Sequence, residues 1–153
     1  LQKKAEKALI ENLLPLAYLL TPNIPEAELI SGISIENESD MKNAAQKIYD
    51  MGAKNVLVKG GHLNANKITD LLFDGANFFE FKSERIETKS THGTGCTLSS
   101  AIAASLAKNI SLNESVKIAI DYINRSIKSA PGIGKGFGPL NHLTKPKDIS
   151  EIE

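Results

Sequence analysis

The sequence is poor in cysteine and has no excess of either charge. Cys96 is the single cysteine among 153 residues, so no disulfide can form within the chain, and we expect a reducing cytoplasm as its compartment. The 18 Lys and Arg residues balance 18 Asp and Glu residues, which gives no indication of nucleic-acid binding. The few histidines are scattered, so no metal cluster of His and Cys is visible.

Long apolar runs are missing as well. A membrane-spanning helix needs about 20 consecutive apolar residues. No stretch of this sequence approaches that length, and we therefore expect no membrane partner. Apolar residues still make up 41% of the chain, which is enough to build the core of one domain. The sequence also shows no internal repeat, low-complexity tract or interdomain linker.

The most informative segment is residues 91–97, Thr-His-Gly-Thr-Gly-Cys-Thr, which we call the glycine loop. Glycine allows sharp turns and a close approach of the backbone to a ligand. A helix-forming apolar run follows, so several backbone N–H groups would meet at the positive end of a helix dipole. These donors would come from Gly93, Thr94, Gly95 and Cys96. The arrangement predicts a phosphate site, although a glycine-rich connection before a packed helix is the alternative.

Two apolar runs place polar residues at predicted strand ends. Residues 56–58 predict a buried strand that delivers Lys59 and two glycines at its C-terminal end. Residues 16–20 are typical of a parallel strand covered on both faces, and Asn23 follows them. Ligands of open α/β sheets bind beyond the carboxyl ends of the strands. We therefore expect Asn23, Lys59 and the glycine loop to converge on one phosphate-handling site.

The remaining pattern predicts an alternation of helices and strands. The two apolar runs are separated by a helix, which predicts a βαβ unit and a parallel pair. Residues 68–73 and 78–81 flank Asp74-Gly75, a tight-turn signal that predicts an antiparallel hairpin near a sheet edge. The glycine-rich segment 132–139 must be held by packing or by a ligand. Helices are expected over residues 3–14, from Pro25, from a cap at Asn37 or Ser39 to Gly52, from the glycine loop to about Lys108, and from a capping box at Ser111.

These segments, in this order, resemble the hydroxymethylpyrimidine kinase/phosphomethylpyrimidine kinase family of thiamine biosynthesis, which belongs to the ribokinase-like superfamily. The string His-Gly-Thr-Gly-Cys-Thr at residues 92–97 is specific within that superfamily, where many members carry Gly-Ala-Gly-Asp. Segments 69–73, 85–88 and 134–142 agree with the resemblance, which covers nearly the whole chain. The chain departs from the pattern at Ser90, beside the glycine loop, where many relatives have Asp or Asn.

The resemblance implies an α/β fold, the ribokinase-like three-layer sandwich, with a mostly parallel sheet and an antiparallel hairpin toward one edge. Members of the family are considerably longer, and their extra residues lie before the position of Leu1. We therefore expect residues 1–153 to be the C-terminal part of a single ribokinase-like kinase domain. The first strands and much of the ring pocket would lie outside it, and the isolated piece would be inactive.

The activity implied by the resemblance is the ATP- and Mg²⁺-dependent phosphorylation of 4-amino-5-hydroxymethyl-2-methylpyrimidine and of its monophosphate. The complete enzyme would bind these small molecules as a homodimer, with no nucleic acid or membrane as partner. A pyridoxal or pyridoxine kinase on the same scaffold is an open alternative, as is an inactive or nucleotide-binding fragment. An acyl transferase with a cysteine nucleophile would need an acid that orients His92, and none is evident nearby.

Cys96 has three possible roles. It could be a small buried hydrophobe, as cysteine often is. It could also be a covalent nucleophile, or a general base toward the substrate hydroxyl. Relatives in the superfamily place an Asp base at the matching position, so the resemblance favours the base. Gly93, Thr94 and Gly95 would hold the transferring phosphate with their backbone N–H groups.

The resemblance assigns roles to further residues. Lys59 would reach a nucleotide phosphate instead of extending into solvent. Asn23 and Glu26 match an Asn-x-x-Glu motif that organises Mg²⁺, with Glu26 acting through water. The alternative for this pair is an Asn-capped helix with an acidic first turn. Thr88 would lie near the nucleotide, and His92 would shape the glycine loop.

Overall fold

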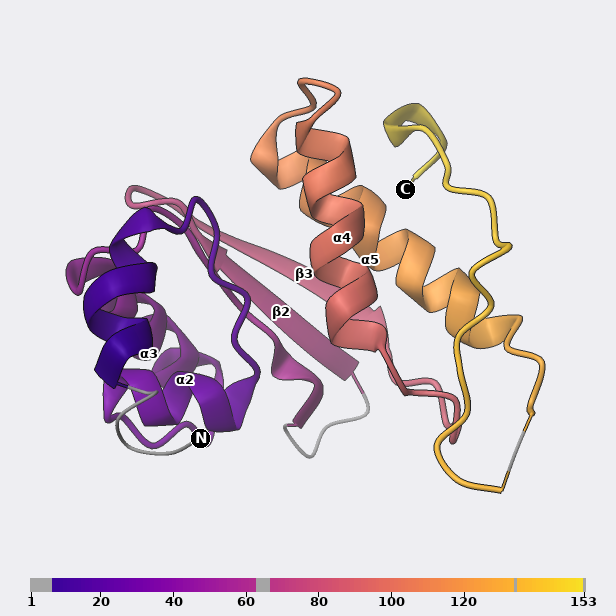
Figure 1. Ribbon diagram of the computed structural model, residues 1–153, viewed down its shortest axis with the longest axis horizontal. Helices are drawn as coiled ribbons and strands as arrows, with labels where there is room; N and C mark the ends of the chain where they lie inside the picture. The colour runs from indigo at the N-terminus through magenta and orange to yellow at the C-terminus, as the bar shows by residue number, and fades with distance from the viewer. Residues whose placement is uncertain (1–6, 63–66, 134, 153) are drawn as a thin grey trace. The chain divides into compact units, whose positions relative to one another are not determined.

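The computed structural model describes residues 7–62, 67–133 and 135–152. The chain divides into two compact units, Leu1–Arg85 and Ile86–Glu153. The first unit carries the sheet with two covering helices, and the second carries a helix pair and the C-terminal tail (Figure 1). Within the described ranges, no helix has the length and apolar character that crossing a membrane requires. The main helices are α2 (Ile24–Ser31), α3 (Glu38–Asp50), α4 (Thr94–Leu106) and α5 (Leu112–Lys128).

The named strands of the first unit form one antiparallel sheet. Its order is β1 (Val56–Val58), β2 (Lys67–Phe73) and β3 (Phe78–Glu84). The predicted hairpin is confirmed as the β2–β3 pair. Its turn is held by Asp74, whose Oδ1 accepts hydrogen bonds from the N–H groups of Ala76 at 2.9 Å and Asn77 at 2.7 Å. The ring of Phe73 stacks on that of Phe78 across the turn, with centroids 4.4 Å apart.

The strand predicted over residues 16–20 is wrong, and the parallel pairing lies later in the chain. Leu14–Leu16 form a 3₁₀ turn, and Ala17 N still donates to the carbonyl of Leu13 at 3.1 Å. Leu16 is 75% exposed and is not covered on both faces. Proline fits the start of a helical turn, so the helical backbone continues through Pro15 to Leu16.

Parallel pairing begins at Leu20, which bridges to Val56, and continues at Asn23, which bridges to Lys59. Leu20 N donates to Asn55 O at 2.9 Å, and Lys59 N donates to Pro22 O at 2.8 Å. The expectation of a mostly parallel sheet is therefore corrected for the strands that the structure describes: they pair antiparallel, and parallel pairing is limited to this extended segment. Antiparallel pairing arises because a tight turn joins β2 to β3, and a short connection returns the chain from β1 to β2.

The predicted N-terminal helix is described only in part. Residues 3–6 lie outside the described residues, and residues 7–8 are helical. The chain then continues through a π-helical turn, Leu9–Leu13, into the 3₁₀ turn that carries Pro15. Leu14 at this junction is fully buried in the core of the first unit.

The core of the first unit lies between α3 and the sheet. Asn37 caps α3 by accepting a hydrogen bond from Asp40 N at 3.1 Å, and Gly52 follows the helix with φ of +114°, as the sequence predicts. The predicted inward residues Met41, Ala44, Ala45 and Ile48 are all fully buried. They pack with Val56, Val58, Leu71 and Phe73 of the sheet. Burial of such side chains supplies the main favourable free energy of folding.

The second unit is built on the packing of α4 against α5. Ser111 caps α5 as predicted, with its Oγ 2.6 Å from Oε2 of Glu114. The buried faces of the two helices present Leu98, Ile102, Val116, Ala119 and Ile123.

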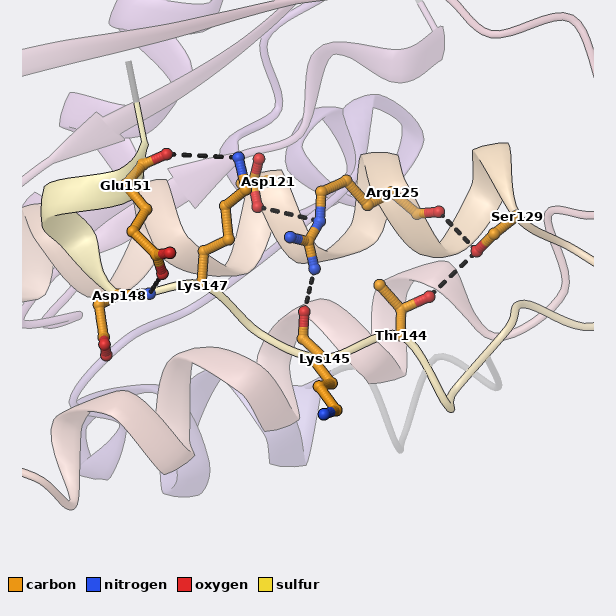
Figure 2. Close-up of polar contacts among 8 residues, drawn as sticks. All are labelled: Asp121, Arg125, Ser129, Thr144, Lys145, Lys147, Asp148 and Glu151. Atoms are coloured by element: carbon orange, nitrogen blue, oxygen red, sulfur yellow. Dashed lines mark hydrogen bonds and ion pairs between the residues drawn. The ribbon is translucent and has the colours of Figure 1, made fainter.

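The C-terminal tail follows α5 back along its length, held by side chains of that helix (Figure 2). Arg125 is central: its Nε lies 3.4 Å from Oδ2 of Asp121, and its guanidinium donates to the carbonyl of Lys145. The hydroxyl groups of Ser129 and Thr144 form a hydrogen bond of 3.0 Å. Further donors to tail carbonyls are Lys117, at 2.9 Å from Ile152 O, and Tyr122, at 3.2 Å from His142 O.

Candidate functional site

The first unit brings together Asn23, Glu26 and Lys59, which we call the strand-end group. Asn23 Oδ1 accepts from Glu26 N at 2.9 Å, and Glu26 Oε2 accepts from Asn23 N at 2.8 Å, which makes a reciprocal cap on α2. Asn23 bridges to Lys59 across the parallel pairing. The predicted meeting of Asn23 and Lys59 is therefore confirmed, although Asn23 follows an extended segment and not the predicted strand. The roles of the two residues toward a ligand stay predictions.

The strand-end group fits a divalent cation only through water. One carboxylate oxygen of Glu26 and the side-chain oxygen of Asn23 already serve the cap. The second carboxylate oxygen of Glu26 has no hydrogen-bond partner among the described residues, and the residue is exposed. No group of three His, Cys, Asp or Glu side chains suited to a metal gathers in the described ranges. Mg²⁺ commonly keeps several waters, so an outer contact at Glu26 suits its chemistry.

The sequence reasoning gave no role to Asp70, which lies beside the strand-end group. Asp70 is on β2, and its Oδ1 accepts a hydrogen bond from Gly60 N at 2.9 Å. Removal of the carboxyl from water raises its pKa to about 6, and the Gly60 N–H and the charge of Lys59 oppose that rise. No local signal marks this residue, because the hydrogen bond joins positions ten residues apart.

The raised pKa of Asp70 makes stability depend on pH. The unfolded chain releases this proton near pH 3.8 and the folded protein near pH 6, so the folded state binds more protons between these values. We expect the Asp70 contribution to the free energy of unfolding to fall by up to about 3 kcal/mol as pH rises from about 4 to 6. Urea unfolding of the full-length protein from pH 4 to 8, compared with Asp70→Asn, measures it. Parallel curves for the two proteins would contradict the assignment.

The second unit contains the glycine loop, and α4 starts where the sequence places it. Gly93 is the N-cap with φ of +84°, a left-handed conformation that favours glycine. The N–H groups of Gly93, Gly95 and Cys96 have no acceptor among the described residues, whereas Thr94 N donates to Thr91 O at 3.4 Å. Of the four donors predicted for an anion, Thr94 is thus already engaged. Cys96 is free and exposed, which removes the buried-hydrophobe alternative.

The tail segment around Gly138 is hydrogen-bonded to the backbone at the start of the glycine loop and just before it. His92 N donates to Gly138 O at 3.2 Å, and Gly138 N donates to Lys89 O at 3.0 Å. Ser90 is buried here, and a Cβ added to Gly138 would lie 3.0 Å from its Oγ. The expectation that the glycine-rich segment is held by packing is confirmed around Gly138. His92 shapes the loop through its backbone, as predicted.

Thr88 is exposed and lies in the second unit, before the glycine loop. Its Oγ1 accepts a hydrogen bond from Ser90 N at 3.0 Å. This bond stabilises the backbone just before the glycine loop. Its predicted contact with a nucleotide stays a prediction. The strand-end group and the glycine loop belong to different units, and their convergence on one ligand stays a prediction as well.

Comparison with known proteins decides the family. Residues 1–141 match the family model described as phosphomethylpyrimidine kinase. The chain belongs to the phosphomethylpyrimidine kinase family.

Curated relatives agree with this family. The chain is 48% identical over 151 residues to the thiamine biosynthesis bifunctional protein ThiED of Geobacter sulfurreducens, covering 99% of this chain and 31% of that protein. It is 43% identical over 144 residues to the hydroxymethylpyrimidine/phosphomethylpyrimidine kinase of Bacillus subtilis, covering 94% of this chain and 53% of that one. The chain thus spans about half the length of the Bacillus enzyme and a smaller share of the Geobacter protein.

Solved structures give the same fold. Pyridoxal kinase from Staphylococcus aureus in complex with AMP-PCP superposes with a TM-score of 0.88 and 36% identity, over 93% of this chain and 53% of that one. Phosphomethylpyrimidine kinase from Clostridium difficile gives a TM-score of 0.71 and 44% identity, over 82% and 50% of the two chains. The predicted ribokinase-like α/β fold of this phosphomethylpyrimidine kinase family member is confirmed.

Proposed function

We propose that the protein transfers the γ-phosphoryl group of ATP to the hydroxymethyl group of 4-amino-5-hydroxymethyl-2-methylpyrimidine, and a further phosphoryl group to the monophosphate. The observation that carries this proposal is the start of α4. There, the N–H groups of Gly95 and Cys96 have no described acceptor, and an exposed thiol lies in the same turn. Family membership supports the same activity.

The chemistry at the start of α4 is positioning and charge neutralisation. Phosphoryl transfer spreads negative charge over the oxygens of the transferring group. Donors at Gly93, Gly95 and Cys96 would bind those oxygens, and the positive end of the α4 dipole would add to their attraction. As a thiolate, Cys96 would take the proton from the substrate hydroxyl while the hydroxyl oxygen attacks the γ-phosphorus, and the bond from that phosphorus to the bridging oxygen would break to release ADP. A reacting thiol has to stay reduced, which suits a cytoplasmic location.

The strand-end group would bind the nucleotide. The Lys59 ammonium would neutralise charge on the ATP phosphates. Asn23 and Glu26 would hold Mg²⁺ through its waters, and the bound ion would reduce the negative charge of the phosphates. Glu26 would keep its bond to Asn23 N while its second carboxylate oxygen faces this hydrated ion.

A second candidate substrate is pyridoxal. It is favoured by the superposition on a pyridoxal kinase, which has the higher of the two TM-scores given above, while the curated relatives favour the pyrimidine. The deciding experiment incubates the full-length protein with ATP, Mg²⁺ and either acceptor, and follows the phosphorylated products by chromatography. Transfer to the hydroxymethylpyrimidine with a higher kcat/KM than to pyridoxal supports the proposal, and the reverse preference selects the second candidate. No transfer to either acceptor would overturn both.

Lys59→Ala is expected to weaken ATP binding and to slow transfer. The substitution removes one positive charge from the phosphate-binding residues, and a charge-assisted contact of this kind is worth on the order of tenfold or more in affinity. Titration of ATP and steady-state kinetics measure the two effects. Lys54→Ala is the matched control, because Lys54 is an exposed lysine just before β1. Unchanged affinity and turnover in Lys59→Ala would show that Lys59 is an ordinary surface lysine.

A further inference from the structure

Asp70 holds the backbone next to Lys59. Its carboxylate accepts the Gly60 N–H at 2.9 Å, and Lys59 N itself donates to Pro22 O at 2.8 Å. The peptide groups on both sides of the Lys59 Cα are therefore fixed by hydrogen bonds. Gly60 is further confined against β2, since a Cβ at this position would lie 2.0 Å from the carbonyl oxygen of Thr69. This turn has little freedom to move.

Asp70 and Lys59 attract each other electrostatically without forming an ion pair. The positive charge of Lys59 attracts the Asp70 carboxylate and so opposes the rise in its pKa, after the larger effects of burial and of the Gly60 N–H. Across the residues that the structure describes, however, no ion pair joins Lys59 to any carboxylate. The ammonium group thus remains available to an anionic ligand, while a fixed negative charge stays nearby.

A carboxylate at this place costs stability at neutral pH, as the raised pKa requires. A neutral acceptor such as asparagine could take the Gly60 hydrogen bond with less desolvation. A half-buried carboxylate that lowers stability and adjoins a candidate phosphate-binding lysine is more readily explained by function than by folding.

We propose that Asp70 is a positioning residue of the phosphate site: by holding the Gly60 N–H and attracting the Lys59 ammonium, it sets the place from which Lys59 binds the nucleotide phosphates. The proposal rests on the proposed function, because it requires Lys59 to bind ATP. Asp70 touches no phosphate and acts through Lys59. Its effect must therefore disappear when the lysine side chain is absent.

The experiment is a double-mutant cycle on ATP affinity in the full-length protein. Asp70→Asn and Asp70→Ala are each made alone and combined with Lys59→Ala, and ATP is titrated at pH 8, where Asp70 is ionised. We expect Asp70→Ala, which loses both the charge and the Gly60 acceptor, to weaken ATP binding by on the order of tenfold, and Asp70→Asn, which can keep the Gly60 hydrogen bond, to weaken it less. In the Lys59→Ala background the same change should have less than about a twofold effect. Glu84→Gln, an exposed carboxylate on β3, controls for loss of one negative charge.

Urea unfolding of the same proteins separates positioning from folding. Asp70→Asn should be at least as stable as the original protein at pH 8, yet bind ATP more weakly. Full ATP affinity in both Asp70 variants, or an equal loss with and without Lys59, would overturn the proposal. If Lys59→Ala alone leaves ATP affinity unchanged, the lysine role in the proposed function fails first. That outcome is distinguished from failure of the Asp70 proposal, in which Lys59→Ala weakens binding and the Asp70 variants do not.

Discussion

Replacing Cys96 with alanine is expected to lower turnover of the full-length protein by about 10²–10⁴-fold, the usual contribution of a group that accepts a proton in the transition state. ATP affinity should change little, because the phosphate donors at this turn are backbone N–H groups that alanine retains. The thiol is exposed in the first turn of α4, so its removal leaves no cavity in the core. Steady-state kinetics and ATP titration separate the two effects.

Cys96→Asp is the informative companion, since a carboxylate can accept the same proton. It should keep more activity than the alanine variant. Ser100→Ala, an exposed position slightly later on α4, is the matched control for a small change in this helix. Near-normal turnover of Cys96→Ala would exclude the base role and leave the α4 N–H groups as the contribution of this turn.

Gly60→Ala should destabilise the protein severely. The added methyl group would lie 2.0 Å from the carbonyl oxygen of Thr69, and this oxygen belongs to the backbone of β2, which is paired on both sides. Neither atom can move without breaking sheet pairing or the Gly60–Asp70 hydrogen bond. We expect the free energy of unfolding to fall by about 3 kcal/mol or more, as for severe overpacking. Urea unfolding measures the loss.

Gly61→Ala is a stringent control for this prediction. Gly61 is the next residue in the same turn, and a Cβ there would meet nothing within 4 Å. Both substitutions reduce the freedom of the unfolded chain equally, so their difference isolates the contact with Thr69. Equal stability of the two variants would show that β2 shifts to accept the methyl group.

Features that depend on neighbours in sequence could be predicted well. Asn37 and Ser111 cap helices because their side chains reach N–H groups three residues on. Asp74 makes its turn by the same short-range chemistry. The left-handed Gly93 and the start of α4 also follow from local pattern. The fold class needed the resemblance to a family in addition to these signals.

Some features that depend on distant contacts could not be predicted. The run over residues 16–20 has the composition of a buried strand, yet its cover depends on partners that composition does not identify. Asp70 looks like an ordinary polar residue within β2 until Gly60 is placed against it. One local contact was missed as well: Thr94 looked like a free donor, but the backbone turn gives it Thr91 O as acceptor. In each case the missing information is which atoms meet.

The bonds between the tail and α5 restrict which side chains α5 can carry more than they restrict the side chains of the tail. Lys117, Tyr122 and Arg125 donate to main-chain carbonyls of the tail. Every amino acid carries such a carbonyl, so these bonds place no demand on the side chains that receive them. Mutations can accumulate at positions such as His142 and Lys145 while the path of the tail persists. The donors have no such freedom, and replacement of Arg125 would remove its bond to the tail even where the sequence of the tail had not changed.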